Sequence, residues 1–153
     1  MKKTSILAAL CAATALASPG FAQSVLRLDE VAVGELDPAK ASDYADSILM
    51  FNVYDTLVLP QQGGPGHAPH LAESWTVDGA TYTFKLRSDV AFQSGNPLRA
   101  EDVVYSIERM QALGAGLSYL FDGVDAEAVD AETVKFTLNQ PYAPFVASLV
   151  RLP

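Results

Sequence analysis

The stretch SWTVDGATYTFKLR, Ser74–Arg87, decides the fold class. Asp78 and Gly79 lie between two runs that alternate apolar and polar residues, and an Asp-Gly pair in this setting is a strong signal for a β-hairpin. The second run divides its residues between two faces: Tyr82, Phe84 and Leu86 on one, and Thr81, Thr83, Lys85 and Arg87 on the other. Strict alternation is typical of an antiparallel sheet with one face on the core and one face in water.

A second hairpin of the same design is predicted downstream, in AEAVDAETVKFTL, residues 126–138. Its inward side chains are expected to be Val134, Phe136 and Leu138. The segment LGAGLSYLFDG, residues 113–123, precedes it and is predicted to be a flexible link. Together the hairpins predict most of one sheet.

A helix from Ala100 to Ala112 is predicted between the hairpins. Its buried stripe is expected to consist of Val103, Ile107 and Met110. The acids Glu101 and Asp102 suit the positive end of the helix. The preceding loop, FQSGNPL, is therefore interpreted as connecting structure.

The flanking segments complete an α+β pattern of antiparallel hairpins with packed helices. A strand is predicted for VLRLDEVAV, residues 25–33, a loop for residues 34–42, and a short helix within residues 141–153. The sequence DYADSILMFNVYDTLV, residues 43–58, predicts a helix that is apolar on most of its circumference and therefore covered nearly all round. Ser42 or Asp43 can cap it. Residues 60–70 contain three Gly and three Pro and are predicted to form a loop.

Residues 1–22 have the pattern of a secretory signal peptide: a basic start, an apolar run and small residues before Gln23. The apolar run has about a dozen residues, fewer than the roughly 20 that span a bilayer. Cys11 would mark a lipoprotein only with a small residue before it, and Leu10 stands there. Export to the periplasm, with removal of Cys11, is the prediction.

The exported part, residues 23–153, is predicted to be acidic and free of disulfides. Losing Lys2 and Lys3 from the 10 basic residues leaves 8 against 18 acidic ones, a net charge of −10. Such a charge argues against binding to nucleic acid or to an anionic membrane surface. Without cysteine, stability must come from the core and from partners.

No residue set in this sequence points to catalysis, a metal or a cofactor. His67 and His70 are the only histidines, and a metal site would need further ligands. They lie in the Gly/Pro-rich segment, so a solvated loop is the expectation. A nucleophile would lack a neighbouring base. Trp75, with the aromatic residues of its hairpin, is expected in the core, whereas Tyr44 and Tyr119 are candidates for exposed contacts.

The motifs of Leu71–Met110 closely resemble the bacterial extracellular solute-binding proteins of family 5, the binding components of ABC importers for peptides, nickel and opines. The supporting motifs are LAESW, YTFKLR, FQSGNPL and AEDV, with LDP and YDTLV upstream and PYAPF downstream. The resemblance extends over nearly all of residues 23–153. One departure is Arg99, where the family usually has Thr or Ser; Arg99 cannot accept a capping hydrogen bond, at a cost of about 1 kcal/mol.

The resemblance implies a portion of the first lobe of a two-lobed periplasmic binding protein, with the second lobe missing from residues 23–153. The implied activity is capture of a small solute, with an oligopeptide the first expectation, and delivery to an ABC permease in the inner membrane. The protein is expected to be a monomer without catalytic residues, metal or cofactor. Ligand contacts are expected in the loop 40–44 and the link 114–119: Ser42, Asp43, Tyr44, Gly116 and Tyr119. The alternatives are a secreted carboxylate-based enzyme and a stand-alone interaction domain.

Overall fold

The computed structural model describes residues 34–151. The predicted signal peptide, residues 1–22, and the predicted strand, residues 25–33, lie outside the described residues. Between Gly34 and Arg151, no helix has the length and apolar character needed to cross a membrane.

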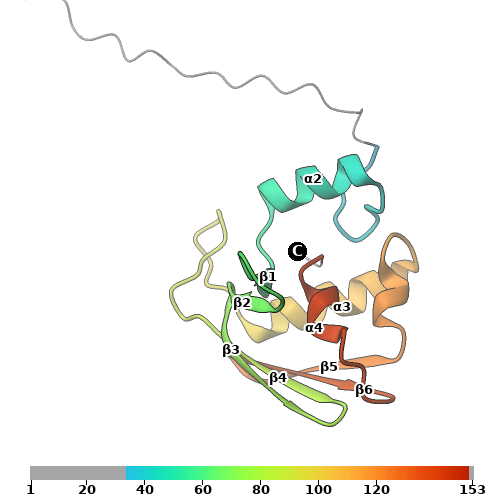
Figure 1. Ribbon diagram of the computed structural model, residues 1–153. Helices are drawn as coiled ribbons and strands as arrows, with labels where there is room; N and C mark the ends of the chain where they lie inside the picture. The colour runs from blue at the N-terminus through green and yellow to red at the C-terminus, as the bar shows by residue number, and fades with distance from the viewer. Residues whose placement is uncertain (1–33, 152–153) are drawn as a thin grey trace, which may run out of the picture. The chain divides into compact units, whose positions relative to one another are not determined.

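The described residues combine helices with antiparallel strands, which confirms the α+β prediction (Figure 1). The elements, in chain order, are α2 (Tyr44–Val53), β1 (Val58–Pro60), β2 (His67–Pro69), β3 (Ala72–Asp78), β4 (Thr81–Leu86), α3 (Ala100–Leu113), the 3-10 helix η2 (Ser118–Phe121), β5 (Val124–Asp130), β6 (Thr133–Leu138) and α4 (Phe145–Leu149). In Figure 1, α3 and α4 lie on the same face of the sheet.

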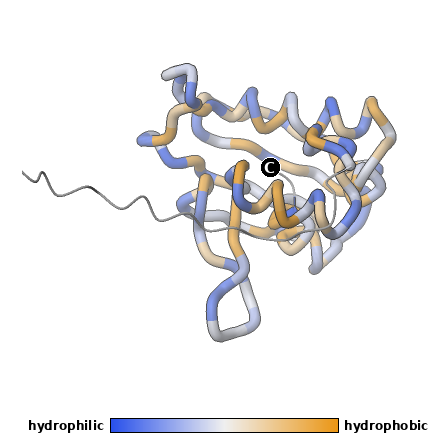
Figure 2. The backbone as a smooth tube through the Cα atoms, turned by 90° about the horizontal axis from the view of Figure 1, so that it is seen from above, coloured by the Kyte–Doolittle hydropathy of each residue, from blue (hydrophilic) through white to orange (hydrophobic). Residues whose placement is uncertain are grey.

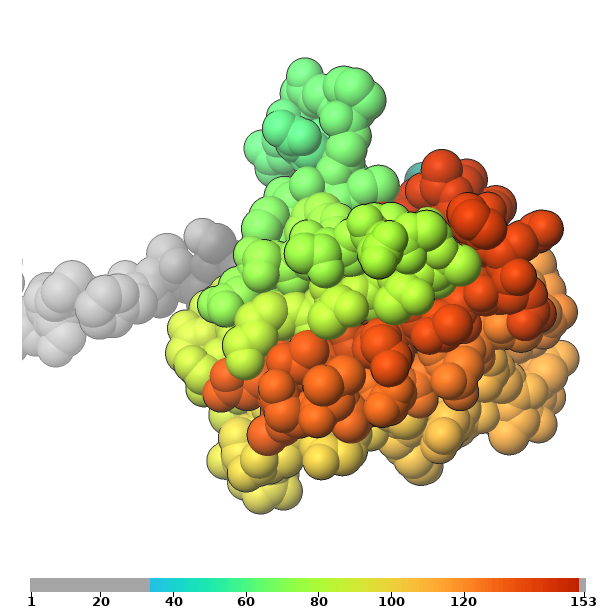
Figure 3. All heavy atoms as spheres, turned by 90° about the horizontal axis from the view of Figure 1, so that it is seen from below, coloured from blue at the N-terminus to red at the C-terminus, as the bar shows by residue number. Residues whose placement is uncertain are grey.

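The two predicted hairpins form one four-stranded sheet in the order β3-β4-β6-β5. The second strand of each hairpin joins the two, and Tyr82 pairs with Phe136 in this central ladder. The face without helices is shown in Figure 3, where the strands lie side by side. Threonine, lysine and glutamate line this outer face, with ion pairs Lys85–Glu132 at 2.9 Å and Lys135–Glu127. Alternation in the sequence therefore predicted both the fold class and the wet face.

The first hairpin turns one residue later than predicted. Asp78 pairs with Thr81, so the turn consists of Gly79 and Ala80. Gly79 has φ +57°, a left-handed conformation that glycine adopts without a steric penalty. A two-residue turn that needs positive φ at its first position draws glycine to that position.

The core lies between the sheet and the helices. Tyr82, Phe84 and Leu86 are buried as predicted, and so are Val134 and Phe136, whereas Leu138 is half-buried. The helix α3 buries its predicted stripe and also Ala100. Aromatic rings meet edge to face in the middle, with centroids 5.7 Å apart for Phe84 and Phe136 and 5.5 Å for Phe136 and Phe145. Trp75, half-buried, stacks on Phe84 at 6.0 Å.

The start of α3 has half of a capping box. The Asp102 carboxylate accepts a hydrogen bond from the Arg99 backbone N–H at 2.9 Å. The reciprocal bond is absent because a guanidinium has no acceptor. The helix ends at Gly114, whose φ of +58° closes its last turn.

Replacing Arg99 with serine is expected to raise the free energy of unfolding by about 1 kcal/mol. The serine hydroxyl can accept the N–H of residue 102 and complete the reciprocal pair with Asp102. Urea unfolding measures the change. Arg99→Ala removes the charge without supplying an acceptor, so an equal gain from Arg99→Ala would contradict this explanation.

The Gly/Pro-rich segment 60–70 is not wholly a loop, which corrects the prediction. Val58–Pro60 and His67–Pro69 form the two-stranded hairpin β1-β2, with Leu59 opposite Ala68. Gly63 and Gly66 have positive φ in the turn between them. This turn stands out from the neighbouring surface in Figure 3 and is coloured hydrophilic to neutral in Figure 2. The prolines lie at the ends of this short ladder, where a missing donor costs little.

The helix α2 is shorter and less covered than predicted. It ends at Val53, and Val58 already belongs to β1. Only Ala45, Asp46 and Met50 are buried. Tyr44, Phe51 and Val53 are 79%, 52% and 59% exposed. Residues 34–151 therefore cover one side of this apolar helix and leave the other side bare.

The link after α3 is held in place, which corrects the prediction of a flexible segment. It contains η2, in which Ser118 and Phe121 are buried. Gln111 fixes its end, because Nε2 donates to the carbonyl oxygens of Phe121 and Val124, at 2.8 Å each. Gln111 lies on α3, so the helix orients the link that follows it.

Candidate functional site

The loop 34–42 is fastened to α3 by one ion pair. Arg109 donates from Nη1 and Nη2 to the two carboxylate oxygens of Asp37, at 2.8 and 2.6 Å. Asp37 also accepts the Ala39 backbone N–H at 3.1 Å, which shapes the turn after Pro38. This paired geometry fixes both distance and orientation. The loop is therefore positioned by a helix 72 residues further along the chain.

The hydrogen bonds from Arg109 lower the pKa of the Asp37 carboxyl from 3.8 to about 2. A carboxyl whose pKa is lowered in the folded state stabilises the fold fully above its ordinary pKa. That contribution is lost as the pH falls from 3.8 through about 2. The loop 34–42 is thus held most firmly near neutral pH.

Replacing Arg109 with glutamine is expected to flatten the fall of stability between pH 4 and pH 2, because the pKa of Asp37 returns towards its ordinary value. Urea unfolding at several pH values in this range measures the slope. Arg99→Gln, which removes the same charge from an arginine without an ion pair within residues 34–151, should keep the slope of the parent protein. Equal slopes for the parent and Arg109→Gln would contradict the assignment.

A second aspartate holds the start of the same loop. Asp46, in the first turn of α2, is 3% exposed, and its Oδ1 accepts the backbone N–H groups of Gly34 at 2.9 Å and Glu35 at 3.2 Å. These bonds, led by that of Glu35, lower the pKa of the Asp46 carboxyl. A buried carboxylate with donors on its oxygens is a stable structural element.

The loop and the link after α3 meet at Gly116. A Cβ at this position would lie 2.9 Å from the Lys40 carbonyl carbon and 3.0 Å from the oxygens of Lys40 and Ala41. The backbones are therefore in direct contact, and φ at Gly116 is +58°. The two segments predicted to contact ligand are brought together here.

The five predicted site residues differ in exposure. Ser42, Asp43 and Tyr44 are exposed at the start of α2, and Gly116 is half-buried. Tyr119 is 64% exposed on η2. Asp43 is the N-cap residue by position, but its side chain makes no capping bond, which leaves its carboxylate in solvent. Tyr44 and Tyr119 are exposed, as predicted.

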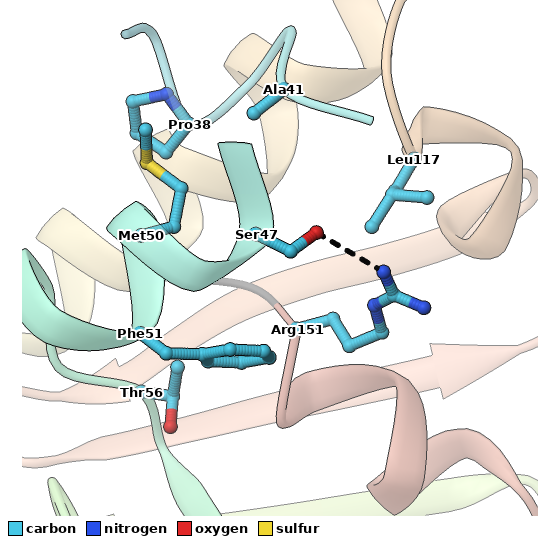
Figure 4. A pocket seen from close by; sticks show the side chains of 8 residues that line it. All are labelled: Pro38, Ala41, Ser47, Met50, Phe51, Thr56, Leu117 and Arg151. Carbon is cyan, nitrogen blue, oxygen red and sulfur yellow. Dashed lines mark hydrogen bonds between the residues drawn. The ribbon is translucent and has the colours of Figure 1, made fainter. Parts of the chain in front are cut away.

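A small pocket of about 20 Å³ lies beside this junction (Figure 4). Its lining residues are Pro38, Ala41, Ser47, Met50, Phe51, Thr56, Leu117 and Arg151. They come from the loop 34–42, α2, the segment between α2 and β1, the link 113–123, and the residue two positions after α4. Sequence patterns could not predict this pocket, because five separate segments form its wall.

A larger groove of about 680 Å³ runs between the end of α2, the loop 90–98 and the start of α3. Its side chains are mostly apolar, including Leu57, Phe92 and Val103. Its two carboxylates already serve the fold: Asp102 bonds to the Arg99 N–H, and Asp55 lies 3.3 Å from His70 Nε2. None of the predicted site residues lines this groove.

The histidines have structural surroundings. His70 Nδ1 lies 3.0 Å from the Thr56 carbonyl oxygen, and His67 belongs to β2. Among residues 34–151, no three or more His, Cys, Asp and Glu side chains are grouped to hold a metal ion.

Known proteins of one family resemble this chain over most of its length. Residues 67–153 match the family described as bacterial extracellular solute-binding proteins, family 5 Middle. A probable D,D-dipeptide-binding periplasmic protein, DdpA from Escherichia coli K12, is 36% identical over 74% of this chain and 23% of its own. Di/tripeptide-binding protein 1 from Pseudomonas aeruginosa UCBPP-PA14 is 34% identical over 96% of this chain and 32% of its own. The chain thus spans about a quarter to a third of the length of these relatives.

A solved structure extends the likeness to the fold. The binding protein MoaA from A. tumefaciens R10, in complex with mannopinic acid, has a TM-score of 0.70 at 33% identity, over 78% of this chain and 26% of that chain. The family match covers more than half of the chain, and the motifs LAESW, YTFKLR and AEDV within it fall on β3, β4 and α3. The chain therefore belongs to the bacterial extracellular solute-binding proteins of family 5.

Proposed function

We propose that this chain is part of the solute-binding component of an ABC importer and forms one wall of the cleft that captures the solute. The observation that carries the proposal is the family match over residues 67–153, together with relatives that are named for binding dipeptides and tripeptides. A peptide-like solute is the first expectation. Solute held between two lobes would favour the closed form, which then docks on the permease.

The ligand contacts are proposed to come from the junction of the loop 40–44 with the link 114–119. Ser42 and Asp43 offer polar groups to a solute, and Tyr44 and Tyr119 offer exposed aromatic faces. Gly116 lets the two backbones approach each other. The Asp37–Arg109 pair supports this role because it holds the loop without using any of these groups.

The remaining parts of the proposal concern compartment and assembly. Residues 1–22 would direct export to the periplasm, residues 23–153 would belong to the first lobe, and the exported protein would act as a monomer beside an inner-membrane ABC permease. The net charge of −10 in residues 23–153 suits a protein that does not adhere to anionic lipid.

The test is a native mass spectrum of the full-length protein purified from the periplasm of its host. The expected result is a complex with a small solute that is released on denaturation. The proposal is overturned if the full-length protein releases no solute and binds no member of a panel of di- and tripeptides in calorimetry.

The enzyme alternative has no support in the site. The family consists of solute-binding proteins. The Asp102 carboxylate caps α3, and Glu73 stands exposed on β3. Single replacements of Glu73 or Asp102 are expected to change stability and not solute binding.

A further inference from the structure

Arg151 lies across the small pocket from α2 and points into it (Figure 4). Its Nη2 donates to Ser47 Oγ at 3.3 Å. The Ser47 hydroxyl itself donates to the Asp43 carbonyl oxygen at 2.9 Å. The Ser47 oxygen is therefore the acceptor in the pair, and the pocket presents a cation at this point.

The guanidinium of Arg151 is far less engaged than those of Arg87 and Arg109. Arg87 and Arg109 each make two bonds to a carboxylate. Within residues 34–151, Arg151 bonds only to Ser47 through its side chain and has no carboxylate oxygen within 4.0 Å. A guanidinium has five N–H donors, so several remain for a ligand.

The surroundings favour a carboxylate as that ligand. Met50 and Leu117 form apolar walls on the inner side of the pocket, whereas Phe51 and Arg151 are exposed, so a solute can reach the guanidinium from the solvent. The volume of about 20 Å³ accepts a group of the size of a water molecule or a carboxylate oxygen, and not a whole solute. Since residues 23–153 carry a net charge of −10, an anionic group needs a local cation to bind here.

We infer that Arg151 binds a carboxylate group of the solute and so selects acids over their neutral amides. The planar fork of the guanidinium matches the two oxygens of a carboxylate. The pocket lies between Ala41 and Leu117, which flank the proposed contacts, so the rest of the solute would extend over the exposed residues of the junction. This inference rests on the proposed function.

The test compares two probes that differ at one group, the dipeptide Ala-Ala and its C-terminal amide, by calorimetry on the full-length protein. The parent protein is expected to bind the free acid about 10- to 100-fold more tightly than the amide, the range for a hydrogen bond to a charged group. Arg151→Gln should lose that preference while its affinity for the amide changes little. Arg151→Lys should retain part of it. Arg99→Gln, with the same loss of charge on an exposed residue away from the pocket, should bind both probes like the parent.

The possible outcomes distinguish a failure of this inference from a failure of the proposed function. Arg151 is not the carboxylate anchor if Arg151→Gln lowers the affinity for both probes equally or leaves the preference for the acid intact. The same conclusion follows if the native solute has no carboxylate. In each of these cases the proposed solute binding is unaffected. If the parent protein binds neither probe and releases no solute, the proposed function fails together with the inference. Thermal unfolding of Arg151→Gln shows whether an equal loss reflects misfolding, which would assign Arg151 a structural role instead.

Discussion

Replacing Phe84 with alanine is expected to lower the free energy of unfolding by about 3–5 kcal/mol. The Phe84 side chain is fully buried and lies between Trp75 and Phe136 in the middle of the sheet. Removing the ring leaves a cavity that backbone ladders on both sides prevent from closing. Since a domain of this size has a free energy of unfolding of about 5–15 kcal/mol in total, the substitution removes a large share of the stability. Urea unfolding, followed by circular dichroism, measures the loss.

Val77→Ala is the matched control for Phe84→Ala. Val77 lies in the neighbouring strand β3 and is 53% exposed. Its truncation should change the free energy of unfolding by no more than about 0.5 kcal/mol. Comparable losses from the two substitutions would mean that the face carrying Phe84 is not the core face.

Replacing Gly116 with alanine is expected to cost about 2–3 kcal/mol and to displace the loop 40–44. Two effects combine: an L-residue at φ +58° costs about 1–2 kcal/mol, and the new methyl group meets the Lys40 carbonyl carbon at 2.9 Å. Backbone atoms cannot turn aside as a flexible side chain can. Affinity for the solute should fall as well, because the loop carries proposed contacts.

Gly114→Ala separates the two effects. Gly114 also has φ +58°, but a Cβ there would have nothing within 4 Å. Gly114→Ala should therefore lower the free energy of unfolding only by the cost of the left-handed backbone conformation. The affinity for the solute should stay unchanged. If Gly114→Ala and Gly116→Ala prove equal in stability and in affinity, the close approach of loop and link has no functional weight.

The sequence predicted the parts of the fold that depend on local pattern. Alternation in residues 81–86 and 133–138 required a pleated strand with one dry face, and periodic apolar residues required α3. The hairpin β1-β2 was missed because its glycines and prolines mask a ladder of three pairs. The predicted covering of α2 was wrong for residues 34–151, since apolar periodicity reports what a helix can bury and not what lies beside it.

For the candidate site, the sequence led only to a proposal of where ligand contacts lie, and that came through the family resemblance. The resemblance placed ligand contacts in the loop 40–44 and the link 114–119, and these segments do touch. The Asp37–Arg109 ion pair, which fastens the loop 34–42 to α3, could not be predicted. Nothing in the sequence around either residue indicates its partner. Arg151 was missed for the same reason. The sequence does not show which segments surround a single arginine after a short helix.

The order β3-β4-β6-β5 has a consequence for the speed of folding. Each hairpin can close on its own within about 1–10 μs. The ladder between β4 and β6 joins Tyr82 to Phe136, which follows it by 54 residues, so a long loop must close first. Docking of the two hairpins is then the slow step of folding. The helix α3 lies between them in the chain, so it sets the distance between the hairpins before they dock. Substitutions along this central seam should slow refolding, whereas those on α2 should chiefly hasten unfolding.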